Sequence, residues 1–346
     1  MAGLEGLLRF APLINAHDHL ELNHYPRTRP RDRYVSAHDW GEDVSKMLNE
    51  PPYEDLRRLP LADRCLAGML KNMLCGVGRV VQHNPPHKML FARDTPTRVE
   101  FTPWVHSLHF DADHTVVEEY RRTPKHVPFS IHLAEGTDDR AHAELGRLRE
   151  LGCLRENTVL IHGVGLTEAD IAYAAPLIRG LVCCPTTNLY LLNALPPMQA
   201  WVAAGGWIAL GSDSRLTADG DLLDEINWAR EHLGWDEARL QSSLDAAEIF
   251  TLMPVKGADS YFMAEQFPRK RADIALIVHE GRALIGHPDA MTAFSDEPSV
   301  MATLDGQPRR LDLRLARKLA ASTIHEPGLT FGELPPEKRA WFFNSR

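Results

Sequence analysis

The chain is short of cysteine, of aromatic residues and of long apolar runs. Its five cysteines are an odd number in 346 residues, and Cys183 and Cys184 are adjacent inside an apolar segment. A disulfide framework needs an even set of spaced cysteines, so we expect reduced thiols in a core. No stretch approaches the ~18 apolar residues of a membrane span, and the first residues lack the basic and apolar regions of a signal peptide. We therefore expect a cytoplasmic protein with no membrane partner.

Positive charge is also scarce. Lys and Arg total 38 against 47 Asp and Glu, which gives a formal net charge of -9. Binding to a nucleic-acid backbone needs concentrated Lys and Arg, so we expect no nucleic-acid partner and a small-molecule substrate instead. The sequence has no internal repeat and no heptad run, which excludes solenoids and coiled coils. The remaining composition, 44% hydrophobic with 23 Gly and 24 Pro, is that of an ordinary globular protein.

Short apolar runs alternate with segments of helical periodicity. The runs that indicate strands are residues 11–16, 78–82, 99–108, 127–133, 158–161, 181–184 and 207–210. Between them, segments such as 137–151 and 222–233 repeat apolar residues at the spacing of an amphipathic helix. This α/β alternation predicts a parallel sheet, open or closed. A TIM-like (β/α)8 barrel needs eight strands, so seven runs predict a barrel that is distorted or one strand short, with one strand missing, short or misread.

Two segments depart from this alternation. Residues 23–60 form a long polar excursion with four arginines between 27 and 33, which is typical of a lid or substrate loop. Those arginines suit an anionic substrate group or, more simply, a solvated basic loop. After residue 268 the pattern changes to strands, and the run 300–304 followed by Asp305-Gly306 predicts a hairpin. We therefore divide the chain into a barrel, residues 10–268, and a C-terminal tail with a small β appendage, residues 269–346.

Polar side chains stand at the ends of several predicted strands. The first ends in His17-Asp18-His19, and the two-residue period of a strand puts both histidines on one face. This pair alone is weak support for a metal, because a polar strand end explains it equally well. Later strands are followed by further candidates: His132, Glu135, His162 and Asp213. The carboxyl ends of barrel strands share one mouth, so these groups can meet there, and imidazoles with a carboxylate suit a divalent metal.

The segments 17–19, 132–136, 162–166, 184–189 and 211–214, taken in this order, resemble the motifs of the amidohydrolase superfamily. The branch they resemble most contains guanine deaminase, cytosine deaminase and the triazine chlorohydrolases, and the resemblance extends over residues 13–278. It implies a hydrolase of carbon–nitrogen bonds other than peptide bonds. It also implies one divalent metal ion per chain, zinc first and iron as the alternative. The ligands that the resemblance implies are His17, His19, His132 and Asp213.

The resemblance also implies catalytic roles. The ion would lower the pKa of its bound water to about 7, and Asp213 would take the proton of that water. Glu135 would protonate the ring nitrogen or leaving amine, and His162 would stabilise the developing oxyanion. Simpler explanations exist for each residue: histidines bonded to backbone carbonyls, Glu135 as an acid favoured in a first helical turn, and Asp213 as an N-cap.

A second set of residues comprises candidate substrate contacts. These are His83, His106, Trp40, Trp104 and Asn188. Aromatic side chains and one amide in a binding pocket suit a flat heterocyclic substrate. The alternative for each residue is that it packs in the core and does not contact substrate. The other histidines, His38 and His109 among them, are interpreted as ordinary surface or core residues.

The sequence departs from the family pattern in its first residues. Only sixteen residues precede His17, where members of this branch carry several dozen that build half of a β-sandwich. We therefore expect an altered substrate, and a homodimer that covers exposed apolar surface. The leading hypothesis is hydrolytic deamination of an amino-substituted heterocycle. Amide hydrolysis or dehalogenation at the same site is the alternative, and a non-catalytic protein that binds a metal is the alternative of a different class.

Overall fold

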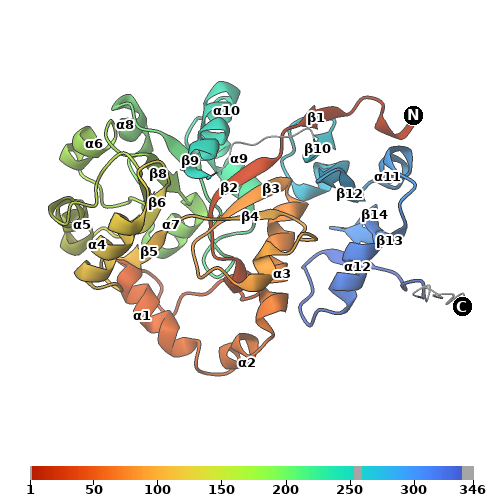
Figure 1. Ribbon diagram of the computed structural model, residues 1–346, viewed down its shortest axis with the longest axis horizontal. Helices are drawn as coiled ribbons and strands as arrows, with labels where there is room; N and C mark the ends of the chain where they lie inside the picture. The colour runs from red at the N-terminus through yellow and green to blue at the C-terminus, as the bar shows by residue number, and fades with distance from the viewer. Residues whose placement is uncertain (1, 253–258, 337–346) are drawn as a thin grey trace, which may run out of the picture.

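The computed structural model describes residues 2–252 and 259–336, which form an α/β barrel joined to a smaller antiparallel sheet (Figure 1). The parallel strands of the barrel are β2 (Leu13–Asp18), β3 (Val77–Gln82), β4 (Arg98–Phe101), β5 (Trp104–Ser107), β6 (Phe129–Leu133), β7 (Thr158–His162), β8 (Gly180–Cys183) and β9 (Ile208–Leu210). Every residue of β2 and of β6 to β9 is buried, because helices cover the outside of these strands and side chains fill the inside.

The barrel is distorted and its hydrogen-bonded ladders do not close. One ladder has the order β2-β3-β4 and the other the order β5-β6-β7-β8-β9. Strands β4 and β5 are separated only by Thr102-Pro103, with no helix between them, so together they occupy the one predicted run 99–108. Proline lacks an N–H, which explains a break in the ladder at this point. The described residues therefore supply eight barrel strands, two of which share one predicted run. The prediction of a distorted TIM-like barrel is confirmed, and the strand that the sequence did not show was misread, because it lies inside the run 99–108.

Helices surround the barrel. They are α1 (Ala37–Met47), α2 (Tyr53–Arg57), α3 (Leu61–Leu74), α4 (Asp113–Arg122), α5 (Asp139–Glu150), α6 (Glu168–Ala174), α7 (Pro185–Leu192), α8 (Met198–Ala203), α9 (Leu222–His232) and α10 (Glu237–Ala246), with 3-10 turns η2 (Leu20–Leu22), η3 (Lys88–Phe91) and η4 (Ala247–Phe250). Helices α5 and α9 lie where the apolar periodicity predicts them. Their starts are capped by the side chains of Asp138 and Asp221.

The second part is an antiparallel sheet with the strand order β1-β10-β11-β12-β14-β13-β15. Its elements are β1 (Leu8–Phe10), β10 (Tyr261–Ala264), β11 (Leu276–His279), β12 (Arg282–Gly286), β13 (Ser299–Leu304), β14 (Gln307–Asp312) and β15 (Leu329–Phe331), with α11 (Pro288–Phe294), α12 (Leu313–Ala320), η1 (Ala2–Leu4) and η5 (Arg271–Asp273). The predicted hairpin is present, because β13 and β14 flank Asp305 and Gly306 at φ values of 49° and 79°.

The N-terminal segment contributes to this sheet more than we expected. Strand β1 pairs with β10, so residues from near the start of the chain extend a sheet built mainly from its last part (Figure 1). Both strands precede residue 269, where we placed the start of the tail. The division at residue 268 thus separates strands of one sheet, and it stays a prediction of the sequence.

The polar excursion lies across the carboxyl ends of the barrel strands. Ser36 caps α1 by accepting a hydrogen bond from His38 N. Ala37 N donates to Glu135 O at 2.9 Å, which fixes the start of α1 to the loop that follows β6. Helix α1 is therefore held over the barrel mouth.

The state of the cysteines and the expectation of no membrane-spanning segment can be compared with the structure. All five cysteines are free and buried, as expected of core thiols. Burial raises the pKa of Cys75, Cys183 and Cys184 well above the usual value, so these thiols stay protonated. Within the described residues, no helix has both the length and the apolar composition that crossing a membrane requires.

Candidate active site

The four predicted metal ligands come together at the barrel mouth. His17 lies at the end of β2 and His19 directly follows that strand, His132 lies on β6, and Asp213 follows β9. The Nε2 atoms of His17 and His19 lie 3.9 and 3.8 Å from Asp213 Oδ1, and His17 Nε2 lies 3.3 Å from His132 Nε2. All four residues are buried. Their ligand atoms belong to two groups that share His17, namely His17 with His19 and Asp213, and His17 with His132 and His162, and within each group the atoms lie within 4.8 Å of one another. Three imidazoles and one carboxylate from strands far apart in the sequence thus lie around one region of the mouth, with the His162 imidazole beside them.

The protonation of these groups fits a metal. His132 Nδ1 lies 2.9 Å from His106 O, and because a carbonyl only accepts, Nδ1 carries the proton and Nε2 presents its lone pair to the site. Burial, reinforced by the neighbouring histidines, lowers the pKa of both His17 and His132 well below 6.5. Neutral imidazoles with inward lone pairs beside a carboxylate are the donor set that a divalent ion such as zinc takes.

Glu135 and His162 lie beside this donor set. His162 Nε2 is 3.5 Å from Glu135 Oε1, and Asn188 Nδ2 donates to His162 Nδ1 at 3.0 Å. Nδ1 therefore accepts, and the proton of His162 is on Nε2, which faces the site. Burial lowers the pKa of His162 to about 4, so the ring is neutral. Burial, with the charges of Asp213 and Glu144, raises the pKa of Glu135 well above 4.5, which favours a protonated carboxyl.

The backbone at three strand ends is in the left-handed region. Ala134, His162 and Asp213 have φ values of 53°, 73° and 49° and follow or end β6, β7 and β9. A non-glycine residue in this conformation costs about 1–3 kcal/mol and persists only where its surroundings hold it. One such restraint is visible at Asp213, whose N–H donates to His17 O at 3.0 Å. The strained turns direct the functional side chains into the mouth.

A cavity of about 410 Å³ opens onto these residues. His19, His132, Glu135, His162 and Asp213 contribute its polar end. Helix α1 with its C-cap, helix α7 and the loop after β9 contribute an apolar wall, which includes Trp40, Val44, Leu48, Leu191 and Leu216. A volume in this range suits a small heterocyclic ligand with one substituent.

The five predicted substrate contacts fall into two groups. Trp40 and His106 line the cavity. His83, Trp104 and Asn188 lie near the site but are not among its lining residues: His83 is 1% exposed beside His17 and His132, Trp104 packs on His83, and Asn188 holds His162. As substrate contacts, all five stay predictions. The positions of the last three indicate support of the functional histidines.

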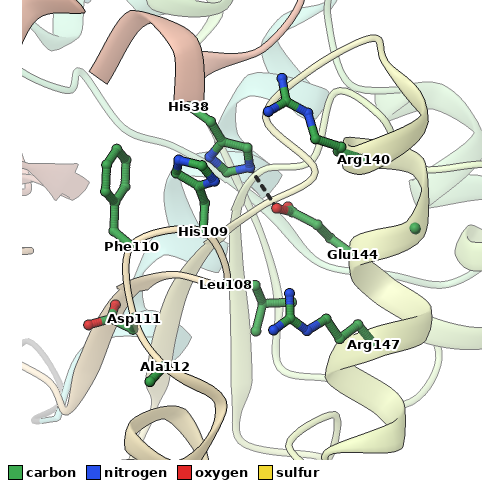
Figure 2. A pocket seen from close by; sticks show the side chains of 10 residues that line it. His38, Leu108, His109, Phe110, Asp111, Ala112, Arg140, Glu144 and Arg147 are labelled. Atoms are coloured by element: carbon green, nitrogen blue, oxygen red, sulfur yellow. Dashed lines mark hydrogen bonds and ion pairs between the residues drawn. The ribbon is translucent and has the colours of Figure 1, made fainter. Parts of the chain in front are cut away.

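The sequence interpretation missed His38, which lines the cavity. His38 Nε2 lies 2.7 Å from Glu144 Oε1, and Glu144 Oε2 accepts a hydrogen bond from Ala134 N at 2.6 Å. Figure 2 shows this contact beside a second pocket of about 550 Å³, which shares His38 and Phe110 with the cavity. No sequence signal distinguished His38, because its partner lies 106 residues away.

Comparison with known proteins identifies relatives of the chain. No family model matches the chain. The chain is 30% identical over 313 residues to the 5-methylthioadenosine/S-adenosylhomocysteine deaminase of Natronomonas pharaonis, covering 74% of this chain and 69% of that protein. The protein of the same name from Haloarcula marismortui is 29% identical over 185 residues, and there the match covers 48% of this chain and 40% of the relative.

Solved structures share the fold. A triazine hydrolase variant has a TM-score of 0.64 at 15% identity, over 81% of this chain and 83% of that one. A zinc-bound adenosine deaminase from Xanthomonas campestris has a TM-score of 0.58 at 16% identity, over 80% of each chain. The chain therefore belongs to the amidohydrolase superfamily, as its motifs predict. It is a hydrolase of carbon–nitrogen bonds with a site for a divalent metal.

Proposed function

We propose that the chain deaminates an uncharged amino-substituted heterocycle by hydrolysis. We further propose that His17, His19, His132 and Asp213 hold one zinc ion. The single observation that carries the proposal is the convergence of this donor set with Glu135 and His162 in one mainly apolar cavity. A bound divalent ion supplies Lewis acidity and lowers the pKa of a water molecule in the site.

The residues of the chain divide the proton transfers between them. Asp213 accepts a proton as water adds to the ring carbon that carries the amine. Glu135 donates a proton to the ring nitrogen, which balances the addition. His162 Nε2–H donates a hydrogen bond to the oxygen that gains charge. The proton on Asp213 then passes to the amine, the carbon–nitrogen bond breaks, and ammonia leaves. As the carbonyl forms, the hydroxyl proton of the adduct returns to Glu135, so both carboxyl groups regain their starting states.

The cavity wall points to a substrate without a formal charge. No Lys or Arg lines the cavity within the described part of the chain. Three of the four arginines between residues 27 and 33 are engaged elsewhere: Arg27 donates to Thr186 O at 3.0 Å, Arg29 to Tyr190 O at 2.5 Å, and Arg31 pairs with Asp43 at 2.6 Å. Phosphate or carboxylate groups would therefore enter without a cationic partner. A thioether nucleoside such as 5-methylthioadenosine fits this cavity better than the charged S-adenosylhomocysteine.

Ammonia release tests the proposal. The purified, zinc-loaded protein would be assayed on amino-purines, amino-pyrimidines and their nucleosides, with each neutral substrate paired with a phosphorylated or carboxylated analogue. We expect ammonia from neutral members and at least about tenfold lower kcat/KM for the charged analogues, which corresponds to about 1.4 kcal/mol. Turnover without ammonia would indicate amide hydrolysis or dehalogenation, and tight binding with no turnover would indicate a binding protein.

A further inference from the structure

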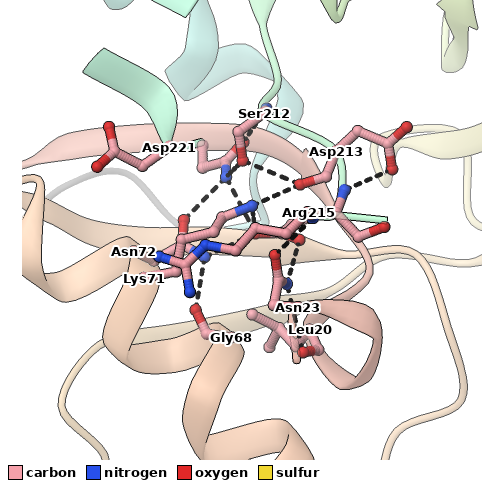
Figure 3. Close-up of polar contacts among 12 residues, drawn as sticks. Leu20, Asn23, Gly68, Lys71, Asn72, Ser212, Asp213, Arg215 and Asp221 are labelled. Atoms are coloured by element: carbon pink, nitrogen blue, oxygen red, sulfur yellow. Dashed lines mark hydrogen bonds and ion pairs between the residues drawn. The ribbon is translucent and has the colours of Figure 1, made fainter. Parts of the chain in front are cut away.

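Lys71 is a buried lysine directly behind the site. It lies on α3, and its side chain is 0% exposed. Its Nζ donates to Asp213 O at 2.6 Å (Figure 3). The same Nζ lies 3.1 Å from Asp18 Oδ2. A lysine this deep is stable as a cation only when it is paired and hydrogen-bonded, and both conditions are met here. It does not line the cavity, so it has no direct part in the reaction.

Asp18, the partner of Lys71, lies between the two histidines of the first motif. Strand alternation turns Asp18 away from the side on which His17 and His19 lie. Its carboxylate accepts from Asn72 Nδ2 at 2.7 Å, from Asn23 Nδ2 at 2.9 Å and from Asn15 Nδ2 at 3.3 Å. Asp18 is thus the centre of a closed polar network, and a shift of this side chain would move the two histidines beside it.

The other contact of Lys71 reaches the fourth ligand position. The left-handed turn at Asp213 directs its carbonyl towards α3, where the Lys71 ammonium donates to it. Ser212, next to Asp213, is joined to Asn15 of β2, since Ser212 N donates to Asn15 Oδ1 at 3.0 Å. Lys71 therefore connects the segments that carry His17, His19 and Asp213, at the place where no ladder joins β9 to β2.

A glycine lets α3 come near enough for this connection. A Cβ atom on Gly68 would lie 2.3 Å from Leu20 O and 2.6 Å from Leu20 Cα. Those atoms are backbone of η2, which directly follows His19, so they cannot move without moving the histidine. Gly68 permits the close approach of α3, and Lys71 and Asn72, on the next turn of the helix, then reach the network.

We propose that Lys71 is a positioning residue whose ammonium, paired with Asp18, fixes the turn of Asp213 relative to His17 and His19 and thereby sets the affinity of the metal site. This inference rests on the ligand set of the proposed function. Outer contacts of this kind change metal affinity by about 10–100-fold when they are removed.

Zinc affinity tests the inference. The Lys71→Met variant removes the charge and the donor at nearly constant volume. Arg79→Met is the matched control, because Arg79 Nη1 and Glu100 Oε1 form another buried ion pair, at 3.1 Å, between β3 and β4. Zinc dissociation constants would be measured by chelator competition on the full-length folded proteins. We expect Lys71→Met to weaken zinc binding about 10–100-fold, and Arg79→Met to change it less than threefold at a similar loss of thermal stability.

A rescue separates positioning from stability. In Lys71→Ala, added propylammonium can fill the space left by the missing atoms, and we expect it to restore zinc affinity, whereas 1-propanol does not. Where Lys71→Met does not fold, Lys71→Gln takes its place. It keeps a donor but removes the charge that is paired with Asp18, so we expect its zinc binding to be weaker than that of the wild type. Equal zinc affinity in the wild type and in a Lys71 variant overturns this inference alone. Absence of zinc binding in the wild type overturns the proposed function with it.

Discussion

At the scale of single residues, the site depends on where each proton is held. Glu135 is placed as a proton donor because burial and two neighbouring carboxylates favour its protonated form, and His162 is kept neutral beside it. Each of the two residues acts through a proton of its own that faces the cavity. A change that removes a transferable proton but keeps the shape should therefore remove catalysis and leave the metal in place.

The Glu135→Gln variant makes this change. We expect kcat for ammonia release to fall about 10²–10⁴-fold, because the amide cannot complete the proton transfer, while the zinc content of the protein stays the same. Elemental analysis and an ammonia assay would be run on the same sample, with exposed Glu150→Gln of α5 as the control. A Glu135→Gln variant that retained more than a tenth of the wild-type kcat would contradict the assigned role.

Single residues also show how far sequence reasoning reaches in this chain. That His17, His19, His132, His162 and Asp213 meet could be predicted because each stands at or just after a strand end, and a barrel brings strand ends to one mouth. The choice of four of them as metal ligands came from the family resemblance. Lys71 could not, because its position in an amphipathic helix looks like a solvent-facing residue until the packing of α3 is known. His38 was missed because its partner comes from another helix. Side chains that act through long-range contacts leave no local pattern.

At the scale of elements, α7 and α9 are joined by a buried carboxyl group. Glu225 of α9 accepts hydrogen bonds from Thr186 N at 3.0 Å and Thr186 Oγ1 at 2.6 Å in the first turn of α7. Complete burial raises the pKa of Glu225 from 4.5 to about 8. The folded chain therefore keeps this proton at neutral pH, whereas the unfolded chain releases it near pH 4.5.

This difference predicts a stability that depends on pH. Since the folded state binds the extra proton between pH 4.5 and about 8, its free energy of unfolding falls as pH rises through that window, by at most about 1.4 kcal/mol per pH unit. The Glu225→Gln variant carries a neutral amide in place of the neutral acid, so its stability should lack this dependence on pH. The free energy of unfolding of the variant should therefore rise relative to that of the wild type as pH rises, and the difference should level off above pH 8. Urea unfolding from pH 5 to 9 measures this difference in the free energy of unfolding, and the exposed Glu231→Gln variant is the control. A stability difference that does not change with pH would contradict the assignment.

The elements also show what the sequence could not specify. The seven apolar runs located the barrel strands, because buried parallel strands are continuous apolar segments. The run 99–108 did not reveal that it breaks at Pro103 into β4, which pairs with β3, and β5, which pairs with β6. Pairing partners depend on the path of the chain in space. The role of β1 was hidden for the same reason, since three residues carry too little pattern to show a distant partner.

At the scale of the whole molecule, Glu326 joins the C-terminal part to the barrel. Its side chain is 1% exposed and accepts from Arg215 at 2.7 and 2.9 Å and from Arg271 at 2.6 Å. Arg215 lies two residues after Asp213, so the ion pair between Glu326 and Arg215 lies next to the site. A homodimer and a cytoplasmic location, both expected from the sequence, stay predictions.

Removal of this carboxylate should destabilise the molecule strongly. Glu326→Ala leaves two largely buried cations without a shared partner, and we expect a loss of about 3–5 kcal/mol in the free energy of unfolding. Glu297→Ala is the matched control, because Glu297 pairs with Arg314 on the surface at 3.8 Å and such a pair contributes about 0–1 kcal/mol. Urea denaturation compares the two. Equal losses would show that Glu326 does not join the two parts.

The pairing of β1 with β10 also has a consequence for biosynthesis. Leu8 pairs with Ala264 and Phe10 with Phe262, so the partner of β1 is synthesised about 250 residues later. At translation rates of about 5–20 residues per second, β1 waits roughly 10–50 s for its partner. During that time its edge is unpaired and Phe10 has no Phe262 to pack against. Strand β1 is thus synthesised early and pairs late. The nascent chain carries an unpaired sheet edge until β10 has been synthesised, after all of the barrel strands.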